Sequence, residues 1–197
     1  MVAINNSLNL VIPIETPQGV IYAHSCPIAH EVFDRFYFVI GKCWSRLFKE
    51  GLGEVAGPRI AAKLLRDIAK ADGILDGEGG VDLGLLREIQ RLTNILLPKD
   101  IGGWQTLPFE EAVHRHALTA EDASEVENAA VFFTLGWSML RRNVREIFVT
   151  GAAELWGAQT TSLNTTEFCA SLPTSTGTEN SGRTETVTEE KASLPPH

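Results

Sequence analysis

The 197-residue chain has few cysteines and no excess of positive charge. Its three cysteines, Cys26, Cys43 and Cys169, lie far apart and lack the paired spacing of a disulfide framework or a metal site. This usage is typical of reduced thiols that pack as small apolar groups. A formal net charge of −8 argues against a surface that neutralises phosphates. We therefore expect no disulfide scaffold and no nucleic-acid partner.

Long apolar runs are also missing. The longest candidate, Ala129 to Leu140, is shorter than the about 20 apolar residues that a membrane helix needs. The first basic residue is Arg35, so the N-terminus lacks the charged region of a signal peptide. We expect a cytoplasmic protein that does not contact a membrane.

Aromatic residues are absent after Leu172, where a polar run from Pro173 to His197 begins. Such a segment has too little apolar surface to offset the entropy lost on ordering it. We therefore expect three segments: an N-terminal β-hairpin segment over residues 1–26, a helical domain over 27–172 and a disordered polar tail over 173–197.

The first segment has the pattern of a β-hairpin. Branched apolar residues dominate Leu8–Ile14 and Val20–Tyr22, and the sequence Thr16-Pro17-Gln18-Gly19 between them is a turn signal. From Pro27 onward the apolar period becomes helical. The sequence thus predicts a mainly α fold, in which an N-terminal β-hairpin is followed by a compact multi-helix domain.

Two helices of this domain have clear signals. One runs from Asp82, buries an inner face that extends to Leu96, and is stopped by Pro98. The other begins at a capping-box pattern, Thr119 to Asp122, and is apolar on nearly every side between Ala129 and Leu140. The second pattern predicts a central helix that is packed all round.

An aromatic helix face is the strongest candidate for partner binding. Its residues recur at helical spacing: Phe33, Phe36, Tyr37, Ile40 and Trp44. The apolar arc is wider than one stripe, so the helix should be covered on two sides, either by its own domain or by a partner. Packing into the core is the ordinary outcome for such a face.

Catalytic and metal-binding patterns are weak. His30 and Asp34, like Glu110 and His114, stand one helical turn apart, but two ligands do not make a zinc site. No P-loop, dinucleotide fingerprint or nucleophile elbow is present. We expect no catalytic residue, no metal and no cofactor. The alternative that stays open is a cytosolic hydrolase that uses His114 or His116 as its general base.

The order of several segments resembles the tail assembly proteins of long-tailed, siphovirus-type bacteriophages. The resemblance extends from Ile12 to Ser181. The segments that carry it are Ile14–Tyr22, His24–Ile28, Glu31–Phe36, Glu50–Gly53, Gly57–Arg59, Ser124–Asn128 and Thr161–Phe168.

This resemblance implies a phage tail assembly chaperone. Such a protein is mostly helical, acts in the host cytoplasm, binds the tape measure protein and helps to recruit tail tube subunits during tail morphogenesis, without catalysis. The aromatic arc would be its contact surface, and formation of a homo-oligomer stays open. The alternative to a chaperone is a structural tail or connector subunit of the virion.

Overall fold

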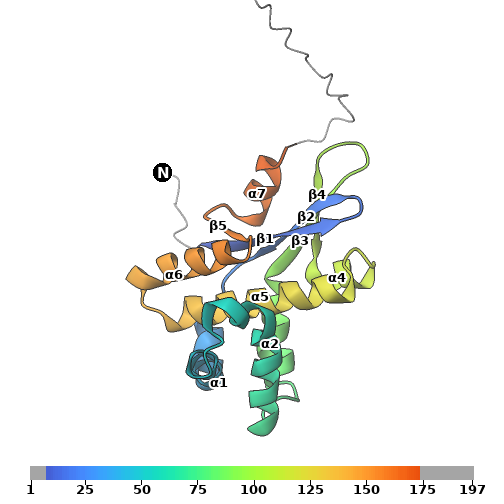
Figure 1. The fold of residues 1–197 in the computed structure, drawn as a ribbon. Helices are drawn as coiled ribbons and strands as arrows, with labels where there is room; N and C mark the ends of the chain where they lie inside the picture. Colours follow the sequence, from blue (N-terminus) through green and yellow to red (C-terminus); the bar gives the residue numbers. More distant parts are fainter. Residues whose placement is uncertain (1–7, 174–197) are drawn as a thin grey trace, which may run out of the picture.

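The computed structural model describes residues 8–173 and has an α/β fold (Figure 1). Within this range five strands form one antiparallel sheet in the order β4-β3-β2-β1-β5. The strands are β1 (Asn9–Thr16), β2 (Gly19–Ser25), β3 (Thr93–Pro98), β4 (Trp104–Pro108) and β5 (Gln159–Thr161). The helices are α1 (His30–Lys49), α2 (Gly53–Ala71), the π-helical turn η1 (Val81–Leu86), α3 (Arg87–Arg91), α4 (Phe109–His114), α5 (Ala120–Met139), α6 (Arg142–Leu155) and α7 (Thr165–Ser171).

The expectation of a mainly α fold with a single N-terminal hairpin is wrong. The hairpin itself is present, with Ile14 opposite Ile21, but its two strands form the middle of a five-stranded sheet. A hairpin alone would leave two rows of backbone N–H and C=O groups without partners. β3 satisfies the outer edge of β2, and β5 pairs with the first part of β1. The sheet therefore joins strands from both sides of the expected boundary after residue 26.

The helix expected from Asp82 through Leu96 is wrong in its second half. Helix α3 ends at Arg91, and the chain continues as strand β3. Ile95 and Leu96 are both fully buried, but they contact different clusters on opposite faces of the sheet. This burial follows from the strand conformation, because side chains of consecutive residues in a strand point to opposite faces of the sheet.

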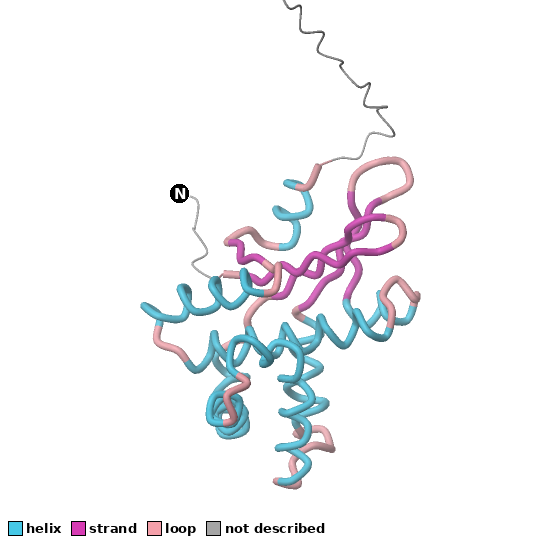
Figure 2. Tube along the Cα trace, in the orientation of Figure 1, coloured by secondary structure: helices cyan, strands magenta, loops and turns pink. Residues whose placement is uncertain are grey.

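The elements form layers, which Figure 2 shows with the strands between helices. Helix α7 covers one face of the sheet, and α4, α5 and α6 pack on the other. Helices α1 and α2 lie on the far side of α5. The expected disordered tail, residues 173–197, lies outside the described residues except for Pro173.

Helix α5 is the predicted central helix, and this prediction is confirmed. One side, including Val126, Phe133 and Trp137, packs with the sheet, and the other side, including Val131 and Phe132, packs with α1 and α2. The predicted capping box is also present at its start, because the Thr119 hydroxyl oxygen accepts from the backbone N–H of Asp122 at 3.1 Å.

Helix α2 approaches α5 closely where its backbone has no side chain. A Cβ atom on Gly57 would overlap the ring of Phe132. Further along the interface, the Arg66 guanidinium donates two hydrogen bonds to the Glu127 carboxylate, at 2.6 and 2.8 Å. The backbone N–H of Ala62 donates to the Asn128 side-chain oxygen at 2.9 Å. Shape and hydrogen bonding together fix the position of α2 on α5.

Helix α7 is held on the sheet by a buried histidine. The imidazole of His24 is fully buried; its Nε2 lies 3.1 Å from the Leu163 carbonyl oxygen, and its Nδ1 lies 3.1 Å from the Thr165 hydroxyl. Because the carbonyl can only accept, Nε2 carries the proton and Nδ1 accepts from Thr165. Burial lowers the pKa of His24 below its ordinary value, and the hydrogen bond to Leu163 opposes this effect.

We predict that Gly57→Ala destabilises the protein and that Gly151→Ala does not. The added methyl group at residue 57 must displace Phe132, which costs about 1–3 kcal/mol. At residue 151 in α6 a Cβ meets nothing within 4 Å, so better helix propensity should add about 0.5–1 kcal/mol. Urea unfolding of both variants measures the two changes. Equal effects would contradict the close approach of α2 to α5.

We also predict that the free energy of unfolding falls as the pH is lowered from about 7.5 to 5.5. The unfolded chain protonates His24 near pH 6.5, whereas the folded protein with its lowered pKa does so only at lower pH, so protons favour unfolding in this window. His24→Gln, which cannot titrate, should show a shallower slope. Histidine NMR titration checks the cause, and an apparent His24 pKa at or above 6.5 would contradict it.

Candidate functional site

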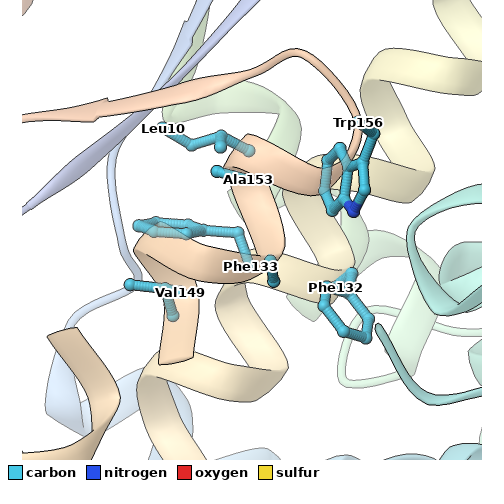
Figure 3. A pocket seen from close by; sticks show the side chains of 7 residues that line it. Leu10, Phe132, Phe133, Val149, Ala153 and Trp156 are labelled. Carbon is cyan, nitrogen blue, oxygen red and sulfur yellow. The ribbon is translucent and has the colours of Figure 1, made fainter. Parts of the chain in front are cut away.

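One enclosed void among the described residues is too small to hold a small-molecule ligand. Figure 3 shows this void between β1, α5 and α6, with Leu10, Phe133 and Val149 around it. Its volume is about 10 Å³, which is close to the space of a single water molecule. Apart from the Trp156 indole nitrogen, the residues around it present only apolar side-chain atoms. It is a packing void between two layers of the core.

The two residue pairs that could have supplied metal ligands each offer too few ligands to form a site. His30 Nε2 lies 3.5 Å from Asp34 Oδ2 on the exposed side of α1. Glu110 forms an ion pair with Arg87 at 3.2 Å. Over residues 8–173, no three His, Cys, Asp or Glu side chains come together in a way that could hold a metal ion.

The two histidines of the hydrolase alternative lie at the end of α4. The side chains of His114 and His116 are both exposed, and His116 has a positive φ of 56°. In the described part of the chain neither side chain forms a hydrogen bond with a serine, threonine or carboxylate. The structure thus places these histidines in solvent.

The five residues of the predicted aromatic face have three different environments. Phe36 and Ile40 are buried in the core between α1, α2 and α5. Trp44 is half-buried among aromatic rings, with its centroid 5.3 Å from that of Phe148. Phe33 is half-buried, and Tyr37 has 61% of its surface exposed. The helix therefore buries one part of its apolar arc and presents another to solvent.

A shallow apolar groove lies at this exposed part of α1. Phe33, Tyr37 and Phe38 come from α1, and Met139 comes from the last turn of α5. Gly41, Lys42 and Ser45 complete its lining. The groove is open to solvent, and its lining is mostly apolar. An exposed surface of this composition is suited to contact with another polypeptide.

Phe38 is an aromatic groove residue that the sequence analysis missed. Its side chain is 59% exposed, its ring packs on Tyr37, and the Lys42 ammonium lies 4.7 Å from its ring centre. Asp34 and Lys42 stand four residues before and after it, which places it on the polar face of the helix. An aromatic residue on a polar face was the signal that could have found it.

Comparisons with protein-family models, curated proteins and solved structures found no match to this chain. Between residues 8 and 173, no helix has both the length and the apolar character needed to span a membrane.

We predict that the core and groove residues of α1 respond differently to truncation. Phe36→Ala should cost about 3–5 kcal/mol of unfolding free energy, because it leaves a cavity in the core. Tyr37→Ser and Phe38→Ser should each cost about 1 kcal/mol or less, because most of each ring is already in solvent. Urea denaturation measures all three. A loss at Tyr37 as large as that at Phe36 would mean that the groove is part of the core.

Proposed function

We propose that the protein is a phage tail assembly chaperone that acts in the host cytoplasm. In this function it binds the tape measure protein and helps to recruit tail tube subunits, without catalysis. Two observations support the proposal. One is the resemblance of the segments between Ile12 and Ser181 to tail assembly proteins. The other, which carries the physical argument, is the unpartnered aromatic groove beside Tyr37 and Phe38.

The groove favours a helical partner over an extended one. It lies between side chains of α1 and the end of α5, away from the edges of the sheet. An extended peptide gains its affinity from backbone hydrogen bonds at a sheet edge, and this surface offers none. An amphipathic helix needs only an apolar surface for its side chains, which the groove provides. Binding of this kind requires no reactive group.

We predict that co-expression with the neighbouring tape measure protein keeps that protein soluble and bound to this chain. The double variant Tyr37→Ser/Phe38→Ser should lower the soluble, co-purifying fraction several-fold, because it removes apolar contact surface. Ile101→Ser is the matched control, since Ile101 is 99% exposed in the loop between β3 and β4. Equal solubility of the tape measure protein with and without this chain would contradict the proposal.

Purified virions give a second measurement. A chaperone leaves before the virion is complete, so it should be absent from them. Stoichiometric amounts of this chain in virions would instead support the alternative of a structural tail or connector subunit.

A further inference from the structure

One residue of the groove lining is a glycine that packing within the chain does not require. Gly41 lies in the middle of the 20-residue helix α1, where glycine is about 0.5–1 kcal/mol less stable than alanine. A Cβ atom at this position would have one near neighbour, Met139 Cε, at an ordinary contact distance of 3.7 Å. Packing within the chain therefore does not require a glycine here.

The contrast with the other glycines near α1 and α5 makes this point clear. A Cβ on Gly57 would overlap Phe132, and a Cβ on Gly84 would lie 2.5 Å from Phe36. Those two glycines allow elements of the same chain to approach each other. Gly41 instead leaves space on the outside of α1, between aromatic rings and Met139. Its missing side chain deepens a surface that faces solvent.

Two positive charges follow the Met139 side of the groove in the chain, although the chain as a whole carries −8. Arg141 and Arg142 lie two and three residues after Met139 in the chain and are both exposed. Neither side chain forms a hydrogen bond or an ion pair with any residue between 8 and 173. Arg142 is also the first residue of α6, where the helix dipole disfavours a cation. The fold thus makes no direct use of their charge.

The remaining charges near the groove differ in their partners. The Lys42 ammonium is bonded to both carboxylate oxygens of Asp72, at 2.7 and 2.8 Å. Asp34, toward the start of α1, lies 3.5 Å from the imidazole of His30, which compensates its charge only when protonated. Glu31 is exposed about one turn earlier, in the first turn of α1. In the described part of the chain, the unpaired charges next after Met139 are the two arginines, and exposed Glu146 follows one helical turn after Arg142.

We propose that the groove binds an amphipathic helix that is acidic at one end. Aliphatic side chains of this helix pack over Gly41, between Tyr37 and Met139, and its acidic residues lie beside Arg141 and Arg142. The inference rests on the proposed function, because it names the chemistry of the partner that this function requires. It adds a charge preference and an orientation that the resemblance does not supply.

The test uses the full-length protein and three synthetic helical peptides of about 20 residues. All three are alanine-based; the first has a leucine stripe at i, i+4, i+7 and i+11 with four glutamates at one end. The second replaces the glutamates with lysines, and the third keeps the glutamates but scrambles the stripe. Fluorescence anisotropy of labelled peptides, at low and at high salt, gives the dissociation constants.

We expect the acidic peptide with the intact stripe to bind at least about tenfold more tightly than either other peptide at low salt. Its advantage over the lysine peptide should shrink as salt screens the charges. Arg141→Glu/Arg142→Glu should reverse the charge preference, because the variant turns this end of the groove negative. Equal binding of acidic and basic peptides, or no binding of any peptide, would overturn the proposal.

Variants of Gly41 test where the peptide lies. Gly41→Leu places a large side chain in the groove and should weaken binding of the acidic peptide at least about tenfold; Gly41→Ala should have a smaller effect and should not lower the melting temperature. Ile101→Ser should bind as the unchanged protein does. Unchanged binding by the Gly41 variants would place the peptide elsewhere. If the peptide tests fail while the tape measure protein is still kept soluble, this inference falls and the proposed function stands.

Discussion

The fold depends on one helix that is buried on two sides. Helix α5 contributes Val126, Phe133 and Trp137 to the cluster beneath the sheet, and Val131 and Phe132 to the cluster shared with α1 and α2. A helix with one apolar stripe could complete only one of these clusters. Because α5 is apolar almost all round, it joins the sheet layer to the α1–α2 layer. Each layer takes its position from the same helix.

Polar groups at the boundaries between layers restrict the relative positions of the helices and the sheet. Apolar contact alone would permit α2 to slide along α5, since hydrophobic attraction has no direction. The two-pronged hydrogen bonding of Arg66 to Glu127 and the Gly57–Phe132 approach select one register. On the other face of the sheet, His24 does the same for α7, because its two ring nitrogens meet groups only two residues apart in the chain. Specific polar contacts thus define an arrangement that burial stabilises.

The sequence predicted those elements whose signals are local. The β1–β2 hairpin, the central helix and its capping box are encoded by neighbouring residues and are present. Strand β3 was missed because Ile95 and Leu96 also fit a helical period, and only pairing with β2, some 70 residues earlier, makes them a strand. Strand β5 has three residues, too few for any pattern. Tertiary pairing decides such segments, and a single sequence does not reveal it.

The candidate site was also predictable only where its signal is local. Helical spacing identified Phe33 and Tyr37, which line the groove, but it also selected Phe36 and Ile40, which fill the core. Spacing gives the apolar arc of a helix and not its boundary with solvent, because that boundary is set by what packs against the helix. Met139 belongs to the groove only because α5 ends against α1, about 100 residues away in the chain.

The two faces of α1 differ in what they contact: the inner face packs in the core, and the outer face lines the groove. The inner face of α1 is held by the core through Phe36, Val39 and Ile40, so the backbone beneath the outer face is rigid. A rigid backbone lets exposed rings such as Tyr37 and Phe38 keep a fixed spacing without a partner, which lowers the entropy that a partner must overcome on binding. The same burial that makes α1 part of the fold therefore holds its outer face in place for the helical partner that we propose.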